Sequence, residues 1–181
     1  MTQTDGVRDA RGTGIEGQER HGLMSDLKDR ILDVVIHQPM LSGFATVTVE
    51  GKPWVRYVVA EASEDLTFRF TSFATARKVE QIARNAEAHL TCGIPDPSKF
   101  HLPYLQIQGR AIFTTDRAER EAFWSDRLKV LFSGPDDPRY GVVVLRAYRI
   151  EYTRVGQPVE VWTREHDLAA EPTGAWHEAH V

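Results

Sequence analysis

The sequence predicts a mainly β fold, an antiparallel barrel of six to seven strands with a few helices. Short segments rich in β-branched and aromatic residues follow one another through tight turns, and only three segments have helical periodicity. Strands joined by tight turns form an antiparallel sheet, and closure of that sheet into a barrel removes its exposed edges. A parallel sheet would need a long crossover after each strand, so the pattern argues against that class.

The elements of the first half are predicted from periodicity and turn residues. Ser25 is a candidate N-cap of a helix whose apolar stripe includes Leu27 and Ile31, and Pro39 ends this helix. A turn at Gly51 separates the first two strands, which β-branched residues indicate. The period changes from Leu41, and the remaining elements of this half are strands over residues 44–49, 54–60 and 66–71, a helix over residues 75–85 and a strand over residues 88–93.

The second half begins with a long strand over residues 104–115. It carries Gly109, where we expect a bulge or the close approach of another backbone. Asp116 and Glu119 fit a capping box at the start of a helix that is predicted to run to Leu131. After a turn cluster, the last strands are predicted over residues 140–154 and 159–163.

One domain is predicted, over residues 24–165. Residues 1–23 contain no apolar segment, which argues against a signal peptide. They are expected to be a disordered leader, or the product of a gene start placed too early, with Met24 as the natural initiator. Residues 166–181 are predicted to form a flexible tail. No apolar run is long enough to cross a bilayer, so no membrane association is expected.

The composition restricts partners and compartment. A formal net charge of −4 and a pI near 6.0 provide no attraction to nucleic acid or to anionic membranes, so a phosphate site would need a local basic cluster. The single cysteine, Cys92, cannot form an internal disulfide, and the cytoplasm is the expected location. His37, His89 and His101 lack the spacing of metal ligands, so no metal site is predicted.

The residues with the most chemical information lie in the second and third strands and in the helix that follows. Arg56 is in the second strand, Thr71 and Ser72 end the third, and Arg77 and Lys78 open the helix. If the two strands pair as a hairpin, these groups converge beside a helix N-terminus, whose unpaired N–H groups and partial positive charge suit a phosphate dianion. Arginine adds bidentate geometry to the phosphate oxygens. The plainer interpretation is that the two helix cations belong to a solvated face.

Several segments resemble the flavin-binding pattern of the pyridoxamine 5′-phosphate oxidase-like split barrels. They are RYVVA at residues 56–60, FRFTS at residues 68–72 and ARKV at residues 76–79, followed by YLQIQGR at residues 104–110. LFSGPDDP at residues 131–138 and VVVLR at residues 142–146 are similar to the general stress protein 26 branch of that family. The resemblance covers about residues 24 to 162.

This resemblance implies a homodimeric split barrel with flavin mononucleotide (FMN) at the dimer interface. It implies that the phosphate is held by Arg56, Ser72, Arg77 and Lys78. The backbone of Tyr57 and Val58 would face the isoalloxazine ring, and Thr71 would contribute at the strand end. Tyr104 and Gln106 share one face of the long strand by the period of two, from which they could reach the cofactor or line an interface.

The chain departs from the parent oxidase where that enzyme binds its substrate. The family's substrate-contacting lysine, five residues after the strand arginine, is replaced by Glu61, whose charge would repel a substrate phosphate. The substrate-helix residues have no counterparts in residues 123–128, and the C-terminal Arg-x-His element is missing. Tyr152 and Thr153 stand where the stress-protein branch commonly has a tryptophan. The sequence therefore predicts a retained cofactor site and a lost vitamin-phosphate site.

The expected function is FMN binding, with the activity of a flavin-dependent oxidoreductase of general stress type and not of a true pyridoxamine phosphate oxidase. The sequence assigns no catalytic acid or base, redox substrate or electron donor, and leaves open whether the protein is an enzyme. Two alternatives use the same barrel: a reductase dependent on the deazaflavin F420, and a non-catalytic flavin or haem sensor. A plain dimeric barrel with an empty pocket conflicts with the clustered cations, because like charges without a ligand repel each other.

Overall fold

Seven antiparallel strands build the part of the chain that the computed structural model describes, residues 26–94 and 96–164. Its elements are a helix over residues 26–35, β1 (Met40–Val47), β2 (Pro53–Ala62), β3 (Thr67–Phe73), α2 (Arg77–Arg84), β4 (Glu87–Cys92), η1 (Pro97–Lys99), β5 (Tyr104–Thr114), α3 (Arg117–Phe123), η2 (Asp126–Val130), β6 (Tyr140–Thr153) and β7 (Glu160–Thr163). The second helix and the strands after β1 agree with their predicted bounds to within two residues. The first helix ends at residue 35, four residues before Pro39, and β1 begins at Met40, four residues before the predicted strand. The expected leader, tail and Ser25 cap lie outside the described residues.

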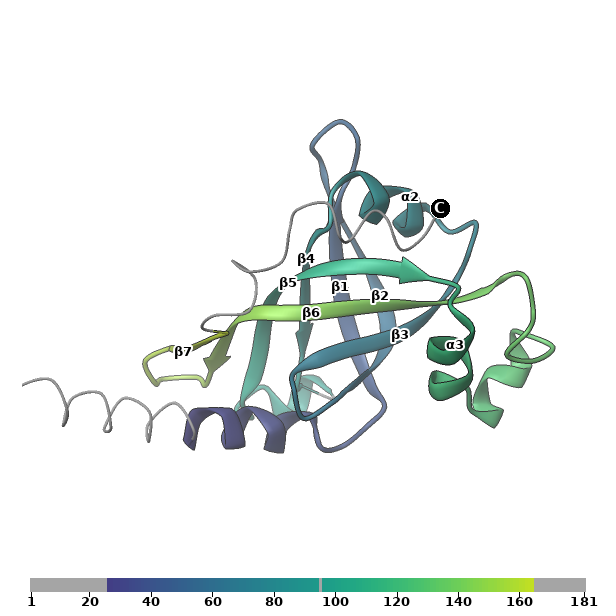
Figure 1. The fold of residues 1–181 in the computed structure, drawn as a ribbon. Helices are drawn as coiled ribbons and strands as arrows, with labels where there is room; N and C mark the ends of the chain where they lie inside the picture. The colour runs from purple at the N-terminus through teal and green to yellow at the C-terminus, as the bar shows by residue number, and fades with distance from the viewer. Residues whose placement is uncertain (1–25, 95, 165–181) are drawn as a thin grey trace, which may run out of the picture.

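The strands close into a barrel. Their order is β3-β2-β1-β4-β5-β6-β7, and β3 also pairs with β6, so the first six strands form a ring and β7 extends β6 (Figure 1). The prediction of a mainly β antiparallel barrel is therefore confirmed. Alternate strand residues point inward, and they bring Phe44, Phe68, Phe70, Ile107 and Ile150 into a fully buried core.

Helices cover the two ends of the barrel. The helix over residues 26–35 buries Leu27, Ile31 and Val35 against the core. At the opposite end α2 lies over the strands and buries Gln81 and Ile82 (Figure 1). The apolar stripe that predicted the first helix is therefore the face by which it packs.

The barrel opens between β2 and β3. These strands pair only at Ala60, Glu61 and Ala62, whereas β3 pairs with β6 along all of Thr67–Phe73. Residues 53–59 of β2 therefore pair with β1 on one side and with no described strand on the other. We call this side of residues 53–59 the open edge.

The backbone groups that face the open edge follow from alternation along β2. Ser63 N–H donates to the Thr67 carbonyl on the β3 side at 3.0 Å, whereas both backbone groups of Ala62 bond the Gln38 side chain on the β1 side. Successive residues of an antiparallel strand direct their backbone groups to opposite neighbours. Odd-numbered positions of β2 thus face β3, and at residues 55, 57 and 59 they face the open edge.

The predicted helix up to Leu131 is wrong. α3 ends at Phe123, Trp124 is extended (φ −64°, ψ 136°), and a short 3-10 helix follows. The reason is the packing of Phe123, Leu128 and Phe132 into one buried cluster beside β6. A continuous α-helix would place the last two about 140° and 180° around the axis from the first, so that one face could not bury all three.

The capping box forms only in part. The Asp116 carboxylate accepts a hydrogen bond from the Glu119 N–H at 3.1 Å, as predicted. The Glu119 carboxylate does not return to Asp116 but pairs with Arg69 Nε at 3.2 Å. The prediction for Gly109 is confirmed, because the β5–β6 register shifts there and a Cβ would lie 2.5 Å from the Arg146 carbonyl oxygen.

Candidate functional site

Three cations gather where α2 covers the end of the barrel. Arg56 comes from β2, and Arg77 and Lys78 form the first turn of α2. Burial, and after it the charge of Arg77, lowers the pKa of Arg56. Burial and the charge of Arg56 likewise lower the pKa of Lys78. Among residues 26–94 and 96–164, no carboxylate forms an ion pair with any of the three.

Ser72 joins this group from the end of β3. The Lys78 Nζ donates to Ser72 Oγ at 3.1 Å, and that hydroxyl donates to the Phe73 carbonyl at 3.1 Å. The ammonium has three protons, so two remain for an anion. The structure therefore brings Arg56, Ser72, Arg77 and Lys78 together, as the sequence predicts.

Arg56 is oriented by neutral acceptors that sequence reasoning missed. Its Nη1 donates to Thr46 Oγ1 at 2.7 Å and to the Phe44 carbonyl at 3.2 Å, and its Nη2 donates to Gln81 Oε1 at 2.8 Å. Thr46 Oγ1 in turn donates to Gln81 Oε1 at 2.6 Å. Both side chains are buried. The available signal was a glutamine next to Ile82 on the apolar face of a short amphipathic helix.

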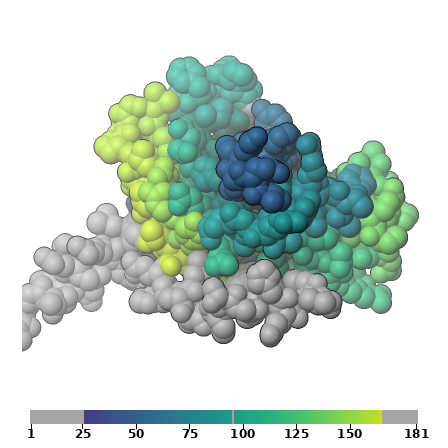
Figure 2. All heavy atoms as spheres, turned by 90° about the horizontal axis from the view of Figure 1, so that it is seen from above, coloured from purple at the N-terminus to yellow at the C-terminus, as the bar shows by residue number. Residues whose placement is uncertain are grey.

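A second contact missed from the sequence orients Arg77. Its guanidinium lies over the Trp54 ring, 4.6 Å from the ring centre. A cation over an indole face is attracted by the ring quadrupole, which favours this position of an otherwise exposed side chain. From above, the dark blue β1–β2 turn stands beside the teal residues that include α2 (Figure 2).

The start of α2 can also accept an anion. Its N-cap is Ala76, which has no side-chain oxygen and makes no capping hydrogen bond. N–H groups of the first turn are therefore not satisfied by a side-chain cap, unlike those of α3, which Asp116 caps. Such N–H groups favour a phosphate at this end of the helix.

Tyr57, Val58 and Thr71 lie around the open edge in different ways. Tyr57 points outward, with 80% of its surface exposed, and its backbone faces the open edge by alternation. Val58 points into the core, and by the same alternation its backbone faces β1. Thr71 lies on the opposite face of β3 from Ser72, and its buried Oγ1 has no hydrogen-bond partner among the described residues.

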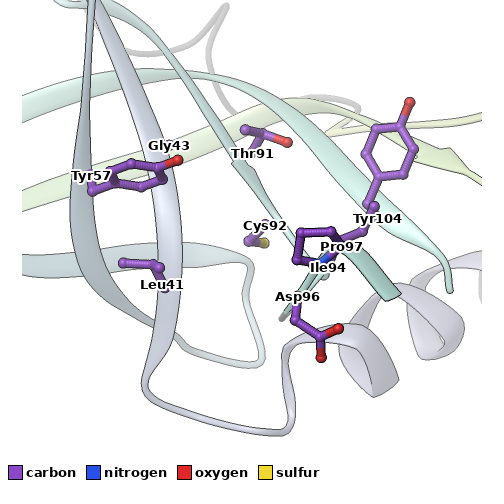
Figure 3. Close-up of a pocket in the computed structure, with 9 residues that line it drawn as sticks. All are labelled: Leu41, Gly43, Tyr57, Thr91, Cys92, Ile94, Asp96, Pro97 and Tyr104. Atoms are coloured by element: carbon purple, nitrogen blue, oxygen red, sulfur yellow. The ribbon is translucent and has the colours of Figure 1, made fainter. Parts of the chain in front are cut away.

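Tyr104 and Gln106 are not near the cations within one chain. They lie on β5, which β1 and β4 separate from β2. Tyr104 and Tyr57 instead line one groove of about 350 Å³ on the outer face of the sheet (Figure 3). Gln106 sits between Thr91 of β4 and Glu151 of β6 in the strand register.

Glu61, the main departure from the parent oxidase, is neutralised by its own chain. Its carboxylate forms an ion pair with Arg127 of η2. In the β2–β3 register it lies opposite Arg69, which pairs with Glu119 of α3. This region therefore carries balanced charges, in contrast to the three cations at the other end of β2.

The remaining candidate groups offer little chemistry. Cys92 is 6% exposed, and burial raises the pKa of its thiol to about 12, which keeps it protonated. No group of three or more metal-ligating side chains occurs in the described ranges. Within the same ranges, no helix has the length and apolarity needed to span a bilayer.

Comparison with known proteins agrees with the barrel fold. The sequence model of the pyridoxamine 5′-phosphate oxidase family matches residues 27–154. General stress protein 26 of Bacillus subtilis (strain 168) is 29% identical over 136 residues, 75% of this chain and 94% of that protein. The crystal structure of general stress protein 26 from Bacillus anthracis str. Sterne has a TM-score of 0.63 at 21% identity, covering 74% of this chain and 97% of that one. The crystal structure of a protein related to general stress protein 26, from Clostridium acetobutylicum, has a TM-score of 0.65 at 19% identity, covering 76% of this chain and 94% of that one.

Two further solved structures share the fold and have names that state a ligand. An FMN binding protein related to pyridoxamine 5′-phosphate oxidase, from Nostoc punctiforme, has a TM-score of 0.56 at 15% identity, covering 89% of this chain and 95% of that one. A heme binding protein from Mycobacterium smegmatis has a TM-score of 0.56 at 18% identity, covering 72% and 55%. At these identities the structures establish the fold alone. The family model spans the barrel from the first helix through β6, and the chain therefore belongs to the pyridoxamine 5′-phosphate oxidase family, with similarity to general stress protein 26.

Proposed function

We propose that this protein binds FMN at the opening between β2 and β3 and acts as a flavin-dependent oxidoreductase of general stress type. The observation that carries this proposal is the group of three cations, Arg56, Arg77 and Lys78, without a carboxylate partner among the described residues. Like charges held together cost free energy unless a ligand compensates them. A phosphate dianion is the compensating group that arginine, lysine and an uncapped helix start recognise best.

The residues present fit FMN. Arg56, Ser72, Arg77 and Lys78 would hold the phosphate, and the Tyr57 backbone at the open edge would meet the polar rim of the ring. Thr71 Oγ1, buried without a partner, is available to a ligand next to this opening. When bound, the flavin supplies hydride and electron transfer, and the protein supplies orientation and electrostatics.

The proposal does not extend to vitamin-phosphate oxidation. Glu61 pairs with Arg127. At that end of the opening, this pair therefore provides no free cation for a substrate phosphate. A substrate of the flavin would therefore not be recognised through a phosphate group bound near Glu61.

We further propose that the active form is a homodimer. Four outward side chains of β1 and β2 are apolar and largely exposed: Leu41 64%, Val55 67%, Tyr57 80% and Val59 46%. A contiguous exposed apolar face on a soluble protein usually marks an interface. A second copy seated there would also cover the groove between Tyr57 and Tyr104, which would bring β5 residues of one chain toward the opening of the other.

The visible spectrum of the purified protein, followed by titration of stripped protein with FMN, tests this function. We expect saturable quenching of flavin fluorescence that weakens strongly in Arg56→Ala and Arg77→Ala. Arg84→Ala is the matched control, because Arg84 ends the same helix, is exposed and pairs with Glu80 of that helix. Absence of FMN binding by the wild type would refute the proposal. F420 and haem, tested in the same way, would then decide between the remaining cofactors.

A further inference from the structure

We propose that Gln81 is a positioning residue that keeps the anion site at its full positive charge. It does so by orienting Arg56 through a neutral acceptor, so that the guanidinium is fixed without being compensated. This inference rests on the proposed function and adds to it the residue that sets the site's preference for a doubly charged phosphate.

The hydrogen bonds around Gln81 make it an acceptor toward Arg56. Gln81 is 8% exposed and Thr46 is 2% exposed, so water does not compete for these contacts. The amide oxygen of Gln81 accepts from Arg56 Nη2 at 2.8 Å and from Thr46 Oγ1 at 2.6 Å. Thr46 gives its only proton to Gln81 and accepts from Arg56 Nη1 at 2.7 Å. The direction of each hydrogen bond in this triangle is therefore determined by its neighbours.

A neutral acceptor is unusual for a partly buried arginine. Such a side chain is normally paired with a carboxylate, because burying a charge without compensation is costly. Here its acceptors are a carbonyl, a hydroxyl and an amide. They satisfy the N–H groups while the positive charge stays available to a ligand. Arg77 and Lys78 add two more charges that interact with Arg56.

Substitution of Gln81 can change the charge of the site with little change in its shape. Gln81→Glu has nearly the same shape, keeps an acceptor toward Arg56 and adds one negative charge beside it. Affinity for inorganic phosphate and FMN should fall at least about tenfold, because the added carboxylate compensates the charge of Arg56 and repels the phosphate. Affinity for riboflavin, which lacks the phosphate, should stay within about twofold on the same reasoning.

Two controls isolate this effect. Ala83→Glu adds the same charge to the same helix at an exposed position and should leave all three affinities unchanged. Gln81→Met keeps the charge of the site but removes the acceptor. It should weaken FMN less than Gln81→Glu does, since the three cations remain. Thermal melting of each variant establishes that it is folded.

The decisive quantity is the ratio of FMN affinity to riboflavin affinity, measured by flavin fluorescence in buffer free of phosphate. A ratio that falls in Gln81→Met and falls further in Gln81→Glu supports the inference. A wild-type ratio in either variant, or an equal loss in both, overturns it. Wild-type protein that binds neither inorganic phosphate nor FMN would instead overturn the proposed function itself.

Discussion

Replacing Tyr57 by arginine should dissociate the proposed homodimer. Tyr57 is 80% exposed and lies among Leu41, Val55 and Val59, which are 46–67% exposed. Burying a fully exposed apolar side chain contributes about 1.5–3 kcal/mol, so these exposed fractions leave about 1–2 kcal/mol for each residue. In a two-fold interface both copies lose the tyrosine contribution. The loss is then about 2–4 kcal/mol before any cost of burying two arginines, and the dissociation constant should rise at least about 30-fold.

Sedimentation velocity over a wide range of protein concentrations measures this change directly. Val130→Arg is the matched control, because Val130 is 84% exposed but lies on η2, outside the exposed apolar face of β1 and β2. We expect it to leave the association state unchanged. A wild type that stays monomeric at high concentration, or a Tyr57→Arg variant that dimerises as well as the wild type, would refute the assignment of this face.

Three further predictions concern stability and titration. Gly109→Ala should lower the melting temperature by about 3–10 °C, because its Cβ would lie 2.5 Å from a carbonyl oxygen. Gly134→Ala, where a Cβ would meet open space, should change it little, and equal melting temperatures would contradict the packing argument. At pH 8 iodoacetamide should modify Cys92 in the folded protein about a thousandfold more slowly than in denatured protein, because burial raises its pKa to about 12; mass spectrometry detects the product, and fast modification would show that the thiol is accessible. Burial also raises the pKa of Tyr140 to about 12. The contribution of the neutral phenol to folding stability is therefore complete below its unfolded pKa near 10 and declines as the pH rises toward 12. The absorbance difference between wild type and Tyr140→Phe should appear only near pH 12, and a step near pH 10 would contradict this prediction.

Much of the fold could be predicted because its signals are local. β-branched runs, turn residues and a glycine inside a long strand determine where strands begin, end and bulge. The third helix could not be predicted, because its end at Phe123 depends on contacts distant in sequence. Phe123, Leu128 and Phe132 pack with Tyr140 and Val142 of β6, and periodicity within residues 116–131 carries no information about that partner.

The residues of the candidate site likewise divide into those that the sequence could predict and those that it could not. Arg56, Ser72, Arg77 and Lys78 could be grouped from strand pairing and from the start of a helix. Thr46 and Gln81 could not, because a threonine in a strand and a glutamine in a helix are ordinary until the barrel places them against the same guanidinium. The open edge was also out of reach, since it follows from a pairing between β2 and β3 that covers three positions only.

The pairing of β3 with β6 has a consequence for the synthesis of the chain. Phe73 pairs with Tyr140 and Thr67 with Arg146, partners that are 67 to 79 positions apart. At about 5–20 residues per second, a ribosome needs roughly 3 to 16 s to add that length. During this interval the nascent chain has made β1, β2 and β3 but has no strand with which to close the ring. Fragments that end before residue 140 should therefore be retained by chaperones or degraded, and native protein should form only after β6 has left the ribosome.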